Sequence, residues 1–581
     1  MIKQLYGCIR EYKKQTVLTP VFMIGEVVCE CIIPMITAQL INSINSGCAM
    51  EDIVKYGIGL VLMAFLSLAF GVLAGKTAAT ASAGFAKNLR HDIFYKIQDF
   101  SFSNIDRFST SSLVTRLTTD INNVQMAFMM IIRIAVRAPL MLIFATVMAT
   151  VVGKKLSLIF LFIVPVLAVG LLLIGMKALP LFRAVFKKYD KLNNSVQENI
   201  KGMRVVKSFV REDYEKKKFA AASEDIRNDF THVERIVVMN GPLMQLAMYT
   251  SMILISFFAA KLIVSSGGQY LDVGSLSSML TYSMQVLMSL MMFSMIFVMI
   301  TMAVASAKRI TEVLSETPDI REKENAVTEV ADGSIDFDFV SFKYSASAEK
   351  FALEDINLHI KSGETVGIIG STGSSKTTLV QLISRLYDVT EGAVRVGGID
   401  VRDYNLKSLR DEVSVVLQKN VLFSGTIKEN LRWGDPDASD AEIERICALA
   451  QAKEFIEGFP DKYDTYIEQG GANVSGGQKQ RLCIARALLK KPKILILDDS
   501  TSAVDMKTDA LIRKAFREEI PGTTKIIIAQ RIASVQDADK IIVLDNGRIN
   551  GMGTHDELLS SNEIYKEAYE IQCKAGADSE E

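Results

Sequence analysis

Residues 365–377 read TVGIIGSTGSSKT, a short apolar run followed by a loop of small residues and a lysine. The apolar run predicts a buried strand. The residues after the loop predict a helix, because apolar side chains recur there at helical spacing: Leu379, Leu382, Ile383 and Leu386. A strand, a glycine-containing loop and a helix form the context in which backbone N–H groups bind phosphate. The stretch therefore predicts a phosphate-binding loop in an α/β domain.

We expect the whole loop and the first turn of its helix to bind nucleotide: Gly370, Ser371, Thr372, Gly373, Ser374, Ser375, Lys376, Thr377 and Thr378. Lys376 is placed to reach the β- and γ-phosphates, and the hydroxyl of Thr377 is placed to hold Mg²⁺. A serine, Ser375, stands where this type of loop usually has a glycine before the lysine. That substitution leaves the local backbone conformation open.

A second apolar run, residues 494–497, ends in two carboxylates, Asp498 and Asp499. A buried strand that ends in carboxylates is the expected partner of a phosphate loop, and Asp498 is expected to hold Mg²⁺. The two motifs lie about 120 residues apart. Together they predict a P-loop fold that binds ATP and Mg²⁺.

Between these motifs, residues 474–478 read VSGGQ and are followed by KQRLCIARAL. This stretch resembles the signature motif and helix of ABC ATPases, and the whole chain is similar to an ABC exporter of the multidrug type. The resemblance implies nucleotide-binding roles for Ser475, Gly476, Gly477 and Gln478, which would complete the ATP site of a partner domain. It also implies that Tyr344 stacks on adenine, that Gln418 acts in catalysis and at the metal, and that Asp505 belongs to the D-loop.

The N-terminal half has the composition of a membrane protein. Charged residues are sparse in six segments, 17–45, 57–75, 126–152, 156–178, 236–266 and 274–306. Each is long enough to cross an apolar layer of about 30 Å, which takes roughly 20 helical residues. We therefore predict an all-α membrane domain with six transmembrane helices over residues 1–315, a charged linker over 316–332, and an ABC nucleotide-binding domain over 333–581.

Basic residues set the expected orientation. They are numerous between the second and third segments and between the fourth and fifth, whereas residues 47–52 and 265–272 contain no Lys or Arg. Since cytoplasmic loops carry the excess of positive charge, we expect a multi-pass protein of the plasma membrane with its nucleotide-binding domain in the cytoplasm. The connection 177–235 is expected to be a long helical hairpin that turns near 211–214. Residues 1–15 predict an interfacial helix in contact with lipid.

Charges inside the spans are costly in lipid and call for an explanation. Glu26 and Glu30 lie four residues apart in the first segment, and Arg133 and Arg137 lie four apart in the third. The two pairs either neutralise one another or contact a cationic substrate. Six methionines recur at helical spacing in the last segment: Met284, Met288, Met291, Met295, Met299 and Met302. They either line a substrate cavity or serve ordinary helix packing.

Two residues depart from the pattern of the family that the chain resembles. Asp499 stands where that family has a glutamate that positions the attacking water, and Gln530 stands where it has a histidine. Two changes in one site suggest a degenerate site whose chain pairs with a second, different half-transporter. On this interpretation, Asp499, Gln530 and Gln418 remain the catalytic group of a slow site.

The predicted function is thus an ATP-hydrolysing subunit of an exporter that moves small amphipathic molecules or lipids by alternating access. Three alternatives stay open: a slow homodimeric exporter of lipid, one of peptide, and a regulatory ATP-binding subunit. No basic arm or RNA-binding motif is present, so no nucleic-acid partner is expected.

Overall fold

The computed structural model describes residues 1–267, 269–345, 348–500 and 502–577. Contacts divide the chain into two compact units. The first holds Met1–Asp99 and Phe108–Glu316, and the second holds Phe100–Arg107 and Thr317–Glu581. The short stretch Phe100–Arg107 therefore lies between helices of the first unit in sequence but groups with the second unit by its contacts.

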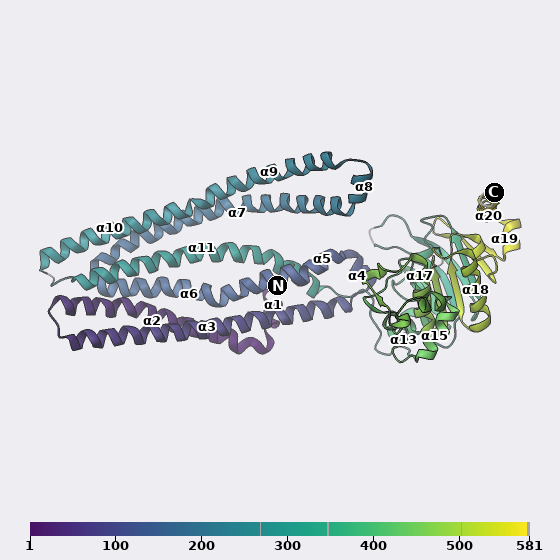
Figure 1. The fold of residues 1–581 in the computed structure, drawn as a ribbon, viewed down its shortest axis with the longest axis horizontal. Helices are drawn as coiled ribbons and strands as arrows, with labels where there is room; N and C mark the ends of the chain where they lie inside the picture. Colours follow the sequence, from purple (N-terminus) through teal and green to yellow (C-terminus); the bar gives the residue numbers. More distant parts are fainter. Residues whose placement is uncertain (268, 346–347, 501, 578–581) are drawn as a thin grey trace. The chain divides into compact units, whose positions relative to one another are not determined.

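Long helices make up the first unit (Figure 1): α2 (Lys13–Asn45), α3 (Met50–Gln98), α6 (Ile121–Gly153), α7 (Leu158–Lys201), α10 (Asn240–Ser266) and α11 (Val273–Ser315). A helix satisfies its own backbone hydrogen bonds, which a bilayer requires of any spanning segment. Length and hydropathy mark five candidate membrane-crossing stretches among the described residues. The third stretch, Thr110–Lys201, contains both α6 and α7, separated by the turn Lys154–Ser157. The six predicted segments thus fall on α2, α3, α6, α7, α10 and α11.

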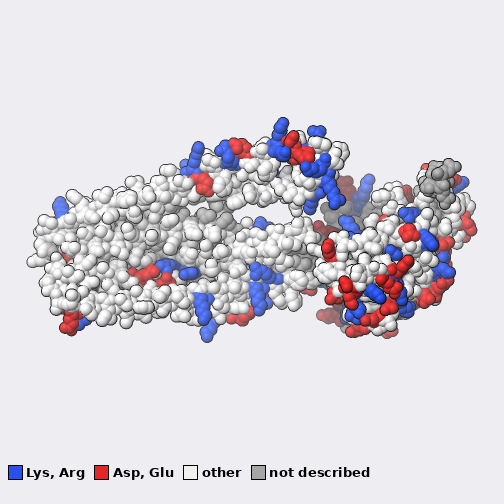
Figure 2. Space-filling view, viewed as in Figure 1, with Lys and Arg blue, Asp and Glu red and all other residues white. Residues whose placement is uncertain are grey.

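This unit also contains the 27-residue helix α9 (Glu212–Val238) and the short helices α1 (Ile2–Gly7), α5 (Thr110–Thr115) and α8 (Met203–Ser208). Figure 1 shows α7 and α9 side by side, joined through α8, so the predicted hairpin is present. Its turn spans the region between Lys201 and Glu212, earlier than the expected 211–214. Val210, with φ of 51°, breaks the helix there. Charged side chains gather around this turn, whereas much of the remaining helical surface is uncharged (Figure 2).

The second unit contains α4 (Phe102–Arg107) and two main sheets. The larger sheet has the strand order β12-β11-β3-β10-β9-β6, from β3 (Thr365–Gly370), β6 (Val413–Val416), β9 (Ile494–Asp498), β10 (Thr524–Ile528), β11 (Lys540–Asp545) and β12 (Arg548–Gly553). All its pairings are parallel except that of β11 with β12. Every residue of β9 and β10 is buried, as expected of central parallel strands covered on both faces.

The smaller antiparallel sheet has the order β2-β1-β4-β5, from β1 (Ile335–Phe342), β2 (Leu353–Ile360), β4 (Glu391–Val396) and β5 (Ile399–Asp400). A two-stranded sheet joins β7 (Gly425–Thr426) to β8 (Tyr466–Ile467). The helices of this unit are α12 (Lys376–Ile383), α13 (Leu406–Glu412), α14 (Ile427–Leu431), α15 (Asp440–Leu449), α16 (Lys453–Glu457), α17 (Gly476–Leu489), α18 (Met506–Glu519), α19 (His555–Ser561) and α20 (Glu563–Ala577).

Strand register places the predicted site residues at one edge of the larger sheet. Ile528 of β10 is level with both Ile368 of β3 and Asp498 of β9. Val416, at the end of β6, is level with Leu497 of β9. At this edge β3 leads into the phosphate loop, β9 into the carboxylate pair, β10 toward Gln530 and β6 toward Gln418. This is the edge at which open α/β sheets bind ligands.

Candidate nucleotide site

The phosphate loop has the backbone of a glycine-rich turn. A Cβ at Gly370 would lie 2.2 Å from the carbonyl oxygen of Leu544, so no side chain fits there. Gly373 has φ of +88°, a conformation that glycine adopts without steric cost. Ser375 takes a left-handed conformation as well, with φ of 69°. The serine therefore keeps the backbone of the glycine that it replaces, at a steric cost of about 1 kcal/mol.

Lys376 begins α12 and folds back over the loop. Its ammonium donates hydrogen bonds to the carbonyl oxygens of Gly370 and Ser371, both at 2.8 Å. Burial lowers the pKa of Lys376, which Asp498 and Asp499 only partly offset. The ammonium of Lys376 is thus bound by main-chain carbonyl groups and makes no direct ion pair in the described residues. A phosphate that enters the loop can therefore replace these carbonyls as its partner.

Thr377 and Asp498 form the predicted metal pair. The hydroxyl of Thr377 donates to Oδ2 of Asp498 at 2.9 Å. Asp498 is only 2% exposed, and burial raises the pKa of its carboxyl. Hydroxyl and carboxylate oxygens, together with phosphate oxygens and water, are the donors that Mg²⁺ takes in phosphate sites. The two side chains therefore fit a magnesium ion.

Asp499 and Gln530, the two departures from the family pattern, contact each other directly. Nε2 of Gln530 donates to Oδ2 of Asp499 at 3.0 Å, and the backbone N–H of Asp499 donates to the carbonyl of Ile528 at 3.0 Å. Asp499 also has φ of 49°, in the left-handed region. The sequence predicted that both residues belong to one site but did not predict this pairing.

Tyr344 lies beside the phosphate helix. Its hydroxyl is 2.8 Å from that of Thr378, and the residue is 52% exposed. The ring meets Tyr387 edge to face, with centroids 5.2 Å apart. Burial is the main cause of the raised pKa of the Tyr344 hydroxyl. A fixed, half-open ring next to the phosphate helix can stack on a base.

The signature motif caps helix α17. The hydroxyl of Ser475 accepts from the N–H of Gln478 at 3.3 Å, and Oε1 of Gln478 accepts from the N–H of Ser475 at 2.9 Å. This capping box fixes the start of a 14-residue helix. At Gly477 a Cβ would approach the carbonyl oxygen of Ala503 to 2.8 Å. Gly476 and Gly477 thus let the D-loop, at Ala503 and Val504, lie close against this helix.

A buried glutamine that the sequence analysis passed over joins these two segments. Gln480 accepts from the N–H of Ala503 at 3.0 Å and lies 3.3 Å from the hydroxyl of Ser502. Asp505, two residues after Ala503, caps α18 by accepting a hydrogen bond from the N–H of Thr508 at 2.9 Å. Gln480 lies on the signature helix two residues after Gln478, and only its burial distinguishes it, so the motif alone does not reveal its role.

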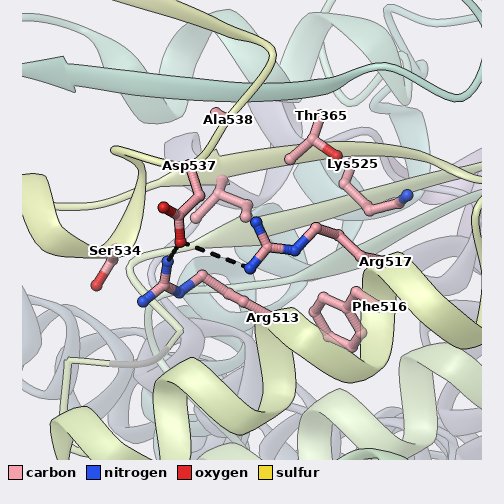
Figure 3. A pocket seen from close by; sticks show the side chains of 9 residues that line it. Thr365, Arg513, Phe516, Arg517, Lys525, Ser534, Asp537 and Ala538 are labelled. Carbon is pink, nitrogen blue, oxygen red and sulfur yellow. Dashed lines mark hydrogen bonds and ion pairs between the residues drawn. The ribbon is translucent and has the colours of Figure 1, made fainter. Parts of the chain in front are cut away.

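Gln418 is exposed and follows β6 by two residues. It shares the sheet edge with Asp498, but no hydrogen bond between Gln418 and Thr377 or Asp498 is found in the part of the chain that the structure describes. A cavity of about 20 Å³ elsewhere in this unit lies between α18 and β10 and is lined by Lys525 and Ile527 of that strand (Figure 3). It has room for about one water molecule and is too small for a nucleotide.

In the helical unit, Arg137 pairs with both predicted acidic residues. Its guanidinium donates to Glu26 and, at 2.8 Å, to both oxygens of Glu30. No partner is found among the described residues for Oε2 of Glu26, which is buried. Arg133 makes no ion pair within the described residues. The structure confirms mutual neutralisation for Arg137 alone, and two carboxylates share one guanidinium.

The methionine stripe of α11 is open in the single chain. Met284, Met288, Met291 and Met295 are between 49% and 64% exposed. Met299 is half-buried, and the side chain of Met302 lies outside the described residues. The exposed part forms one apolar face of the helix, because its members are three or four residues apart.

The chain matches known proteins over nearly its whole length. Residues 17–291 match the family model "ABC transporter transmembrane region", and residues 353–502 match "ABC transporter". The chain is 36% identical over 572 residues to "Uncharacterized ABC transporter ATP-binding protein YfiB" of Bacillus subtilis, covering 98% of this chain and 99% of that protein. It is 35% identical over 567 residues to MT1311 of Mycobacterium tuberculosis, an "Uncharacterized ABC transporter ATP-binding protein", with 96% of each chain covered.

A solved structure described as "a bacterial Atm1-family ABC exporter with ATP bound" shares the fold, with a TM-score of 0.81 and 23% identity over 97% of this chain and 98% of that one. The predicted architecture, a helical membrane domain of ABC exporter type joined to an α/β nucleotide-binding domain, is confirmed. A multi-pass membrane domain fused to one ATP-binding domain makes the chain an ATPase coupled to transport. The protein belongs to the ABC transporter family as a half-transporter of exporter fold.

Proposed function

We propose that this chain is the degenerate-site subunit of a heterodimeric exporter of small amphipathic molecules, with its nucleotide-binding domain in the cytoplasm. The hydrogen bond from Gln530 to Asp499 carries the proposal. A general base must approach the proton that it accepts to within about 2.6–3.2 Å, directly or through one water. Asp499 is one methylene shorter than glutamate, and the amide of Gln530 occupies one of its oxygens.

In this proposal the chain's own site binds ATP and turns it over slowly. Thr377 and Asp498 hold Mg²⁺, whose charge offsets that of the phosphates when it is bound. Lys376 leaves the carbonyls of Gly370 and Ser371 for the phosphate oxygens. Tyr344 stacks on adenine. Gln418 and Gln530 orient groups near the γ-phosphate, and neither carries a positive charge.

The signature motif serves the other site. Ser475 and Gln478 are already ordered by their mutual hydrogen bonds, so binding the partner's nucleotide costs little additional ordering. Asp505 and Gln480 hold the D-loop in place beside them. An intact signature motif beside a weakened catalytic pair is the combination expected when hydrolysis takes place mainly on the partner's phosphate loop.

The open methionine face of α11 supports varied amphipathic substrates, because methionine is flexible and polarisable and adapts to ligands of different shape. The excess carboxylate around Arg137 supports substrates that carry a positive charge. A dedicated lipid exporter would use the same apolar face, but phospholipid alone would then stimulate its ATP hydrolysis.

The test is the intact mass of the complex purified from native membranes through a tag on this chain. We expect a second chain of similar size, in whose sequence the positions equivalent to Asp499 and Gln530 hold Glu and His. Twice the mass of this chain alone would refute the heterodimer. Stimulation of ATP hydrolysis in reconstituted vesicles by amphipathic cations, and not by phospholipid alone, is the expected sign of the substrate class. No stimulation by either would indicate a regulatory subunit.

A further inference from the structure

The C-terminal helix contacts the segment that carries Gln530. Helix α20 is anchored at its start by Tyr565, which is fully buried. The Tyr565 hydroxyl lies 2.8 Å from Nδ1 of His555, and its N–H donates to Oδ1 of Asn562 at 3.0 Å. These contacts fix the helix about two turns before Gln572, so the position of Gln572 is set by the core of the domain.

The side chain of Gln572 makes hydrogen bonds to the backbone on both sides of Arg531. Its Oε1 accepts from the N–H of Ile532 at 2.8 Å, and its Nε2 donates to the carbonyl of Gln530 at 2.9 Å. One side-chain amide thus bonds two main-chain groups that face the same way, as a neighbouring strand would. Two simultaneous hydrogen bonds fix the orientation of this segment more tightly than one could.

The far side of the same segment is held from another helix. Ser534 donates to Oδ2 of Asp509 at 3.0 Å, and Arg513 pairs with both Asp509 and Asp537. Figure 3 shows Arg513 and Arg517 of α18 converging on Asp537, with Ser534 beside them. Ile532 itself is buried. The exposed end at Gln530 and Arg531 is therefore the part whose backbone position depends on Gln572.

We propose that Gln572 is a positioning residue for the nucleotide site and acts through Gln530. A line of hydrogen bonds runs from Gln572 to the backbone of Gln530, and from the side chain of Gln530 to Asp499. The proposal rests on the proposed function in one respect, namely that Gln530 faces the γ-phosphate. A group that contacts only the γ-phosphate distinguishes ATP from ADP, and misplacing it by about 0.5 Å is enough to weaken that distinction.

The experiment uses the full complex, purified through a tag on this chain, and measures release of labelled ATP and of labelled ADP in the presence of Mg²⁺. The variants are Gln572→Ala, Gln530→Ala and the double variant. Glu567→Ala is the matched control, because Glu567 is an exposed residue of the same helix. Losing the two hydrogen bonds of Gln572 is expected to speed ATP release about threefold to tenfold, with ADP release unchanged. Gln572→Glu keeps the acceptor for Ile532 and should give an intermediate rate.

The double variant shows whether Gln572 acts through Gln530. We expect it to release ATP no faster than Gln530→Ala alone, since coupled residues are not additive. Additive effects, or equal acceleration of ATP and ADP release, would overturn the positioning role and indicate a general loosening of the domain. If Gln530→Ala itself does not distinguish ATP from ADP, the proposed role of Gln530 fails. If it does and Gln572→Ala does not, only the positioning inference fails.

Discussion

Nε2 of Gln530 donates a hydrogen bond to Oδ2 of Asp499 at 3.0 Å. The two residues that depart from the family pattern therefore form one unit. The amide of Gln530 occupies one oxygen of the Asp499 carboxylate, and the pair carries no imidazole. Restoring only one member would leave the other mismatched, so both must change together.

We expect the double substitution Asp499→Glu and Gln530→His to raise ATP turnover at this chain's own site by at least about tenfold, since a well-placed general base contributes roughly 10²–10⁴ in rate. Each single substitution should raise it less. The measurement is steady-state ATP hydrolysis at saturating Mg²⁺ and ATP by the purified complex, with the partner's equivalent catalytic glutamate changed to glutamine so that only this site contributes. Adding Asp498→Asn to the double variant is the control, and it should abolish the gain if the new activity arises in this site. Unchanged turnover in the double variant would count against the degenerate-site assignment.

The buried carboxyl of Asp498 should lower the stability of the folded protein when it is ionised, and this cost should depend on pH. Burial raises its pKa above the ordinary value of 3.8, so the folded protein holds this proton more tightly than the unfolded chain does. The ionised carboxylate therefore costs stability, and the cost appears as the pH rises above 3.8 and persists at neutral pH. Asp498→Asn should raise the unfolding temperature of the nucleotide-free protein at neutral pH, with the gain vanishing toward pH 3.8.

The same substitution should remove the stabilisation that ATP gives only in the presence of Mg²⁺. Asp505 provides the contrast, because hydrogen bonds from Thr508 lower the pKa of its carboxyl. Asp505→Ala should therefore lower the unfolding temperature at neutral pH, and the loss should shrink as the pH falls below 3.8. Equal effects of the two substitutions at neutral pH would contradict the assignment of Asp498 as a buried metal ligand whose charge costs stability.

Ser375 predicts a stabilising substitution. A left-handed conformation costs a residue with a Cβ about 1–2 kcal/mol, which glycine avoids. Glycine in turn costs about 0.5–1 kcal/mol, because it gives the unfolded chain more conformational freedom. Ser375→Gly should therefore stabilise the domain by up to about 1 kcal/mol. Thermal unfolding without nucleotide measures this gain. Ser374→Gly is the control and should destabilise, because Ser374 is buried and receives a hydrogen bond from Lys376.

The local motifs of the nucleotide site could be predicted from sequence because each is short and directly follows the end of one strand. Thr377 and Asp498 meet because β3 and β9 flank β10, and apolar runs of the right length signal all three strands. Gln572 could not be predicted. It lies 42 residues from its partner Gln530, is exposed, and belongs to no motif. The hairpin turn was misplaced because apolar residues continue through α8, whereas α7 already ends at Lys201.

A substitution at Tyr387 should affect transport while leaving basal ATP hydrolysis unchanged. Its hydroxyl donates to Asp106 of α4 at 2.6 Å, and its ring contacts both Phe102 and Tyr344. Helix α4 lies between α3 and α5 in sequence but belongs by contacts to the nucleotide-binding unit, so this hydrogen bond holds a segment through which the two units are joined. Tyr387→Phe keeps the ring contacts and removes only the hydroxyl.

We expect Tyr387→Phe to keep basal ATP hydrolysis and to lower substrate stimulation about tenfold or more, because a hydrogen bond to a charged group contributes about 1.5–3 kcal/mol. Tyr466→Phe is the control, because Tyr466 is an exposed tyrosine of the same unit. Vesicle-based ATPase and transport assays give both readouts. A proportional loss of basal and stimulated activity would mean that Tyr387 supports the nucleotide site and not the coupling of the units.

Arg137 predicts a strict charge balance inside the membrane domain. It is the ion-pair partner of both Glu26 and Glu30, so its removal leaves one buried and one partly buried carboxylate without a cation. Breaking a buried ion pair from one side costs about 3–5 kcal/mol, whereas replacing the whole group with uncharged residues of similar size is often neutral. Arg137→Met should therefore lower the unfolding temperature sharply, and Arg133→Met should change it little.

Adding Glu26→Gln and Glu30→Gln to Arg137→Met should restore most of the lost stability, because no buried charge remains. If the triple variant is stable and still transports neutral amphiphiles but not cationic ones, the excess carboxylate serves substrate recognition. If it transports both, the triad is structural and serves only to join α2 to α6. A triple variant as unstable as Arg137→Met would show that the guanidinium contributes packing that no charge balance replaces, and the argument from charge would fail.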